Sequence, residues 1–328
     1  MRTATHRLIV VPLVALATSG VFLLAPAAVI AQGGDPTGEG DPADSRWIPS
    51  LSIQTGIAVN KREGEVSSIE RGFQDGRTTQ IFGTFGSSLQ LETPRLSFIP
   101  SQPRFFARAD IIYSADDKES LVSEGVPEDS IVKLGDGYNL EAGPVEQVVG
   151  RGSALRPQVE PLVLGGGLGL SFQTDVLGRK LRIKPSIEWM FQRDEISLEF
   201  SDVEGNGNDP DRCQPECRAV SISAQDTKGY HSLGPGLELD YDTGRAGDFR
   251  VSIFSRFSAL AILGDRNSRL VATGSWLTRT VERINGENVI TSIDPASGRE
   301  DTTVSSRYKR DLWSYVVVAG FRIYWDPR

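Results

Sequence analysis

Side-chain polarity alternates with a period of two along much of this chain, and this pattern constrains the fold more than any other feature. In the segment 181–191, apolar residues occupy most odd positions and mainly charged or polar residues occupy the even ones. The segment 313–325 repeats the alternation, with aromatic residues at both ends and aliphatic residues between them. Because successive side chains of a strand point to opposite faces, this period predicts strands with one apolar and one polar face.

The same alternation predicts eight strands whose connections differ in length. The strands are expected at 51–59, 79–91, 104–113, 159–173, 180–193, 230–241, 248–263 and 312–325. The connections are short at 92–103, 174–179 and 242–247 and long at 60–78, 114–158, 194–229 and 264–311. Long and short connections alternate strictly. A soluble β-sandwich has no physical reason to place its long connections at one end and its short ones at the other. Several strands reach the roughly 9–11 residues that a tilted strand needs to cross a bilayer.

The N-terminal residues have the layout of an export signal. Basic residues up to Arg7 precede an apolar stretch at 8–24 and a small-residue stretch that ends at Ala31. This layout predicts a signal peptide, residues 1–31, cleaved after Ala31. Residues 32–50 are rich in Gly, Pro and acidic residues and are expected to form a disordered periplasmic leader. The barrel domain is expected at 51–325, and no apolar run of transmembrane-helix length follows the signal.

With these features, residues 51 to 328 resemble the small outer-membrane barrels of Gram-negative bacteria, the OmpA/OmpX-like class. The resemblance implies an all-β fold, an antiparallel up-and-down transmembrane β-barrel of about eight strands with long external loops and periplasmic termini. The connections 194–229 and 264–311 are themselves partly periodic, which indicates either hairpins that rise above the membrane or two extra membrane strands. Ten strands are therefore the second choice. The sequence departs from the class in that three residues follow Trp325.

The polar faces of the strands are expected to fill the interior of the barrel. The predicted lumen network consists of Arg108, Asp110, Arg182, Lys184, Glu188, Glu238, Asp240, Arg250, Arg256 and Arg322. Because unpaired buried charges are strongly unfavourable, Arg182 and Lys184 should pair with Glu238 and Asp240 on the neighbouring strand. The alternate glycines at 165, 167 and 169 suit a cramped interior. This pattern favours a lumen plugged by ion pairs over a narrow charged pore.

Two further groups of residues were considered as sites. Cys213 and Cys217 are the only cysteines, and in an exported chain they predict a disulfide. His231 is the only histidine after the signal, and Ser232 follows it. Adjacent strand residues point to opposite faces, so these two cannot form a catalytic pair, and no catalytic residue is predicted.

An acidic loop offers a weak calcium candidate. Asp202, Glu204, Asn206 and Asn208 match the first half of a calcium loop, but Cys213 stands where the closing acid is required. An ordinary surface loop is the favoured interpretation. The net charge of −8 makes the chain a poor binder of nucleic acid, whose phosphates require a basic face.

The expected function is therefore non-enzymatic, with no cofactor. We expect a bacterial outer-membrane barrel whose surface-exposed loops have a structural, adhesive or ligand-contacting role. Expected partners are outer-membrane lipid and lipopolysaccharide, the barrel-assembly machinery and an unidentified external ligand. The alternatives are a narrow porin-like channel for ions or small solutes, a lipid-modifying or proteolytic barrel enzyme and, last, a soluble periplasmic binding protein.

Overall fold

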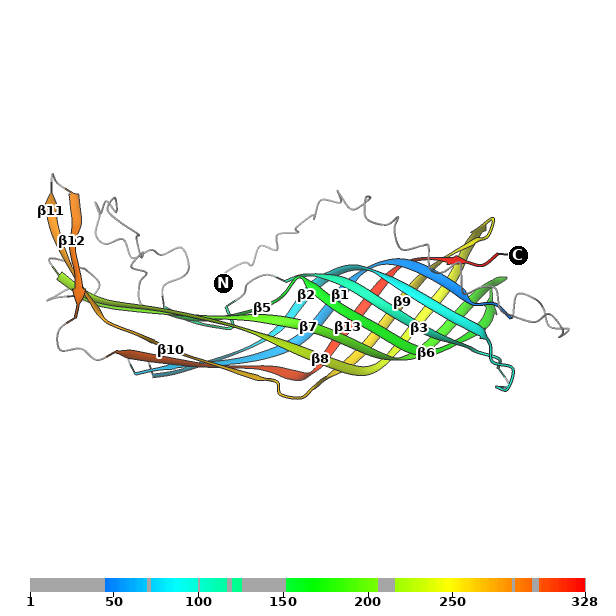
Figure 1. Cartoon of the computed structure of the whole chain (residues 1–328), viewed down its shortest axis with the longest axis horizontal. Helices are drawn as coiled ribbons and strands as arrows, with labels where there is room; N and C mark the ends of the chain where they lie inside the picture. Colours follow the sequence, from blue (N-terminus) through cyan, green and yellow to red (C-terminus); the bar gives the residue numbers. More distant parts are fainter. Residues whose placement is uncertain are drawn as a thin grey trace, which may run out of the picture.

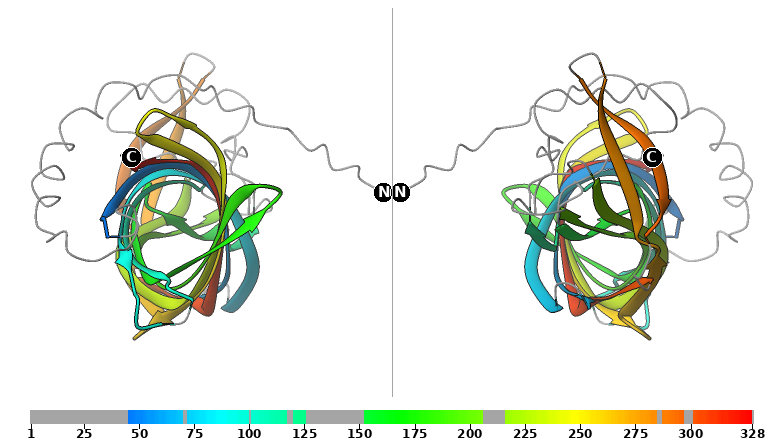
Figure 2. Two further views of the ribbon diagram at one scale, coloured as in Figure 1. Left: turned by 90° about the vertical axis from the view of Figure 1, so that its right-hand side faces the viewer. Right: turned by 90° about the vertical axis from the view of Figure 1, so that its left-hand side faces the viewer.

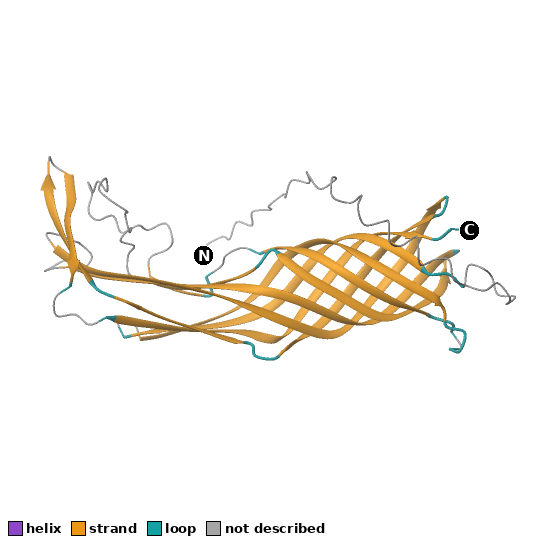
Figure 3. Cartoon of the chain, in the orientation of Figure 1, coloured by secondary structure: helices purple, strands orange, loops and turns teal. Residues whose placement is uncertain are grey.

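The computed structural model describes residues 45–69, 72–99, 101–116, 120–125, 152–205, 216–284, 287–296 and 301–327. Regular structure in these ranges consists of β-strands (Figure 3). No helix of the described residues is long and apolar enough to cross a membrane. The predicted signal peptide 1–31 and most of the predicted leader lie outside the described residues.

Eight antiparallel strands form a closed ring. They are β1 (Ile48–Ser68), β2 (Gly72–Arg95), β3 (Arg104–Ala115), β6 (Leu162–Val176), β7 (Arg179–Gly205), β8 (Glu216–Ala246), β9 (Phe249–Leu263) and β13 (Thr302–Trp325). Each pairs with the next in this order, and β13 returns to β1. Figure 2 shows the ring end on. The predicted fold class is confirmed, and the second choice of ten strands is wrong.

The ring strands are longer than the sequence predicted. β7 and β8 remain paired from Leu181 opposite Tyr241 to Gly205 opposite Cys217. The connections 60–78 and 194–229 are therefore mostly long hairpins that continue the barrel strands, and for 194–229 this is one of the two structures that its periodicity predicts. The expected strand 159–173 is also divided, because residues 160 and 161 separate β5 (Gly152–Val159) from β6. Proline at position 161 has no N–H for a ladder hydrogen bond, which favours this break.

Beyond the ring, the extended strands form two facing sheets. One sheet has the order β4-β5-β7-β8-β11-β12, and the other has the order β10-β13-β1-β2. The additional strands are β4 (Val122–Gly125), β5, β10 (Asn267–Gly274), β11 (Leu277–Ile284) and β12 (Glu287–Pro295). We call this part the distal sandwich. It stretches away from the barrel along the long axis of the molecule (Figure 1).

The polarity of the two strand faces exchanges between the ring and the distal sandwich. In the ring part of β7, Ile187 is exposed on the outer face and Lys184 is buried inside. Farther along the same strand, Ile196 and Leu198 are buried on that same inner face, with no exposed surface. β13 shows the same exchange: Val317 is exposed on the outer face in the ring, whereas Val304 is buried on the inner face in the distal part. The barrel is thus apolar outside and mainly polar inside, whereas the sandwich has an apolar interior.

The distal sandwich has a hydrophobic core of its own, to which both sheets contribute. The core includes Val66, Leu121, Val122, Leu155, Ile196, Leu198, Phe200, Val220, Ile222, Leu270, Trp276 and Val304. The three short connections lie at the opposite end of the molecule, beside the first residue of β1 and the last of β13. In the turn between β6 and β7, Leu177 and Gly178 both have positive φ, as a tight reversal requires.

Candidate functional site in the barrel lumen

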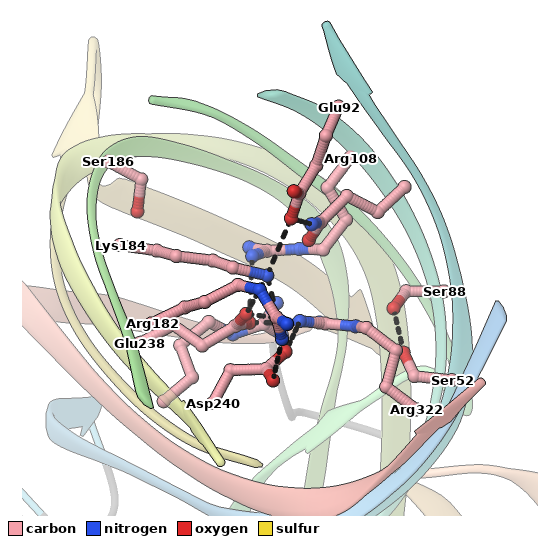
Figure 4. A network of polar contacts seen from close by, with 12 residues as sticks. Ser52, Ser88, Glu92, Arg108, Arg182, Lys184, Ser186, Glu238, Asp240 and Arg322 are labelled. Atoms are coloured by element: carbon pink, nitrogen blue, oxygen red, sulfur yellow. Dashed lines mark hydrogen bonds and ion pairs between the residues drawn. The ribbon is translucent and has the colours of Figure 1, made fainter. Parts of the chain in front are cut away.

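The lumen is built in three layers between the short turns and the distal sandwich: a charged layer, an apolar ring and an upper polar layer. The charged layer contains all ten residues of the predicted lumen network, each at most 8% exposed. The register places Arg182 opposite Asp240 and Lys184 opposite Glu238. Nitrogen–oxygen distances are 3.0 Å for Arg182–Asp240 and 3.3 Å for Lys184–Glu238 (Figure 4). The structure therefore brings together the two strands' charges as expected.

Glu238 lies at the centre of the charged layer. Its carboxylate accepts hydrogen bonds from Arg322 and lies 3.4 Å from the guanidinium of Arg108. Arg108 also bonds Asp110, at 3.1 Å, and Glu188. The layer is thus one connected network across the lumen and not a set of separate pairs.

Three members of the charged layer were missed by the sequence analysis. Glu92 lies 3.0 Å from Lys184, and Asp242 lies 2.8 Å from Arg182. The Tyr324 hydroxyl donates to Asp240 and lies 2.6 Å from Lys184. Glu92 lies one residue beyond the expected end of its strand, although it keeps the inward parity, and Asp242 was assigned to a turn. With both acids, the described layer has six cations and six anions, and Arg250 also pairs with Asp326 at 2.9 Å at the turn end of the lumen.

The wall beside the charged layer has no room for side chains at two glycines. A Cβ on Gly167 would lie 2.9 Å from Glu188 Oε2 and 3.0 Å from Arg108 Nη2. A Cβ on Gly236 would lie 2.5 Å from Glu188 Cγ. A Cβ at either position would force the Glu188 or Arg108 side chain to shift, so glycine suits the wall where these charged groups pack against it. The lumen is filled at this level, as in other barrels of this size.

An apolar ring closes the lumen next to the charged layer. Seven of the eight ring strands contribute a buried apolar side chain, and three more apolar residues pack against them. The seven are Ala58, Phe82, Ile112, Val163, Met190, Leu260 and Val316, and the three are Val159, Phe254 and Val318. Met190 lies on the mostly polar even face of its strand, and the ring is not evident from the sequence, because each strand supplies only one or two such residues.

The upper polar layer separates the apolar ring from the core of the distal sandwich. Tyr308 donates a hydrogen bond to Asp194 at 2.7 Å, and Arg310 lies 3.5 Å from the same carboxylate. Arg62 lies 3.4 Å from Asp116, which also accepts a 2.6 Å bond from the Val159 N–H. Burial raises the pKa of Asp116, and these two donors offset only part of that effect. Burial and the Asp194 carboxylate raise the pKa of Tyr308.

His231 lies on the outer surface of the barrel. Its ring packs against those of Trp189 and Phe191, with centroid distances of 6.0 Å and 4.8 Å. Ser232 is buried on the lumen side. The two side chains therefore point to opposite faces, and His231 belongs to an aromatic cluster at the edge of the apolar surface.

The remaining candidates fall mostly outside the described residues. Asp202 lies in β7, whereas Asn206, Asn208 and Cys213 are not described, and neither are the side chains of Glu204 and Cys217. The disulfide and the calcium loop therefore remain predictions. In the described ranges, no three histidine, cysteine or acidic side chains come together in a way that could hold a metal ion.

Comparisons with known proteins reach only the level of the fold. No family model and no curated protein matches the chain. Among solved structures, the chain is similar to the attachment invasion locus protein Ail of Yersinia pestis, with 8% identity, a TM-score of 0.25 and coverage of 82% of this chain and 97% of Ail. It is also similar to the outer-membrane protease OmpT of Escherichia coli, with 9% identity, a TM-score of 0.27 and coverage of 84% and 96%. A Pseudomonas aeruginosa FadL homologue gives 9% identity, a TM-score of 0.23 and coverage of 86% and 90%. Likeness at this level carries no argument about function.

Proposed function

We propose that this chain is a bacterial outer-membrane protein in which a sealed barrel anchors a β-sandwich outside the cell. The observation that carries the proposal is the exchange of polarity along continuous strands. Exposed apolar side chains surround the ring, whereas the sandwich exposes mainly polar side chains around an apolar core. An apolar outer surface suits lipid, and a polar outer surface suits water. The outer boundary of the membrane therefore falls near the level at which the polarity of the strand faces changes.

The orientation follows from the connections. Barrels of the outer membrane have short periplasmic turns and long external segments. The three short connections lie at the ring's free end, and the long hairpins form the sandwich at the other. The sandwich therefore faces the exterior, and the aromatic cluster of Trp189, Phe191 and His231 lies at the outer headgroup level. Phospholipid and lipopolysaccharide are the molecules that would surround this surface.

Two features oppose conduction. The apolar ring disfavours water and ions in the lumen, because a narrow hydrophobic constriction dewets. Each cation of the charged layer is paired with at least one anion, so no unpaired charge is available to attract an ion of either sign. We therefore favour a non-conducting, non-enzymatic scaffold over the channel, and also over the enzyme, because the His231 side chain points away from the buried Ser232.

Ion flux through reconstituted protein tests this proposal. Liposomes containing the wild-type protein should hold a potassium gradient as long as protein-free liposomes do. The Glu238→Gln/Arg322→Met variant should also remain silent, since the apolar ring is intact, whereas adding Phe82→Gly and Met190→Gly should open a leak. The leaking variant shows that insertion was achieved. Steady conductance through the wild-type protein would contradict the sealed barrel and favour the alternative function as a channel.

A further inference from the structure

The outer face of the distal sheet β10-β13-β1-β2 has an unusual row of charges. The register places Arg269 opposite Arg307, Arg307 opposite Glu65, and Glu65 opposite Asp75. The row therefore reads two cations followed by two anions across four strands. Like charges directly opposite each other destabilise a sheet, so a single copy contains two unfavourable pairs in this row.

The neighbouring row on the barrel side is already neutralised within the chain. Glu63 lies 3.3 Å from Lys309 and 3.4 Å from Arg77. By contrast, Arg269, Arg307 and Asp75 are exposed, and Glu65 is half-buried. The charged row is thus accessible to a partner along its whole length.

The next row toward the tip is uncharged and carries exposed apolar groups. It consists of Val271, Ser305, Ser67 and Phe73, again one residue from each strand. Phe73 is 64% exposed and Val271 is 56% exposed, and Ile69, in the turn directly after β1, is 86% exposed. These three are the large apolar side chains that the described part of the distal sandwich exposes, and all belong to this sheet.

We propose that a second copy of this chain docks on this face and forms a two-fold symmetric dimer. A two-fold axis parallel to the strands, between β13 and β1, reverses the order of each row in the facing copy. Arg269 and Arg307 of one copy then face Asp75 and Glu65 of the other, and Val271 faces Phe73. Each pair of like charges in one copy therefore faces a pair of opposite charges in the other copy. A two-fold interface requires such self-complementarity, because both copies contribute the same surface.

The direction of this axis agrees with a shared membrane. The strands of the docking sheet β10-β13-β1-β2 run roughly along the long axis of the molecule, which is also the direction of the barrel (Figure 1). A two-fold axis in that direction keeps both barrels in one bilayer with the same orientation. Dimerisation goes beyond the proposed anchoring function, and failure of the dimer leaves the barrel and its sealed lumen unaffected.

Complementary charge reversals test the dimer in reconstituted bilayers. The Arg269→Glu/Arg307→Glu variant has four acidic residues in the row, and the Glu65→Arg/Asp75→Arg variant has four basic residues. Each variant alone should dimerise about 100-fold more weakly than the wild-type protein, because only like charges meet. An equimolar mixture should form heterodimers at least as well as the wild type forms homodimers. A monomeric wild type, undiminished dimerisation of either variant, or a mixture that stays monomeric would overturn the proposal.

A cross-linking experiment keeps the proposal testable if a charge-reversed variant does not fold. Ser305→Cys lies beside the proposed axis, and Ser223→Cys is a matched control on the outer face of the opposite sheet. Both are made with Cys213 and Cys217 replaced by serine. A short bifunctional maleimide, long enough to span the roughly 10 Å between packed sheets, should join Ser305→Cys copies and not Ser223→Cys copies. Equal cross-linking at the two positions would contradict the docking face.

Discussion

Replacing Glu238 with glutamine should destabilise the barrel by about 3–5 kcal/mol, the usual cost of breaking a buried ion pair. Glu238 has no exposed surface and contacts Arg322, Lys184 and Arg108. Without its charge, three buried cations lose an anionic partner. Arg322→Met should lower the free energy of unfolding by a similar amount, because it leaves the negative charge of Glu238 without this partner. Urea unfolding of the protein in lipid measures both.

The double variant Glu238→Gln/Arg322→Met should recover most of the lost stability, because it restores the charge balance. The exposed pair Arg156–Glu199, at 2.8 Å, provides the matched control, and Glu199→Gln should cost less than about 1 kcal/mol. If the two single losses simply add, Glu238 and Arg322 do not interact, and a water-filled lumen becomes the better account.

Replacing Leu198 with alanine should destabilise the distal sandwich by about 2–5 kcal/mol. Leu198 is fully buried in the apolar core, so the substitution removes packed methyl groups and leaves a cavity. Native-state proteolysis reports local opening, and 2 kcal/mol corresponds to cleavage about 30-fold faster. The ring strands should remain protected, because the cavity lies outside the barrel.

Leu239→Ala serves as the comparison, since Leu239 is 45% exposed on the outer surface of the barrel. It should leave the cleavage rate of the distal hairpins unchanged. Equal sensitivity of the two variants would mean that the distal sheets do not share a core.

Period-two alternation was sufficient to predict the ring, its eight strands and the inward charges. Arg182, Lys184, Glu238 and Asp240 were identified because their strands alternate without interruption. The length of the strands was not predicted, although the signal was present. At Ile196 and Leu198 the apolar residues change from the outer to the inner parity, a periodicity that predicts either a hairpin rising above the membrane or an extra membrane strand, and the structure has the hairpin.

The apolar ring and the upper polar layer could not be predicted from single strands. Met190 or Val316 alone is only one apolar residue on a mostly polar face, and the ring exists because the registers bring seven strands to one level. Asp116 and Asp194 lie far apart in the sequence and approach the same layer only when the barrel closes. The charge row on the distal sheet depends in the same way on the pairing of β10 with β13.

The central claim is that one strand passes from lipid into the exterior medium, and labelling of intact cells tests it most directly. Three single-cysteine variants are made with Cys213 and Cys217 replaced by serine: Ser223→Cys in the sandwich, Leu237→Cys on the ring part of the same strand β8, and Leu177→Cys in the β6–β7 turn. A membrane-impermeant maleimide should label position 223 on intact cells, leave 237 unlabelled, and reach 177 only after the outer membrane is opened. Labelling of 177 but not 223 on intact cells, or equal labelling of 223 and 237, would contradict the account.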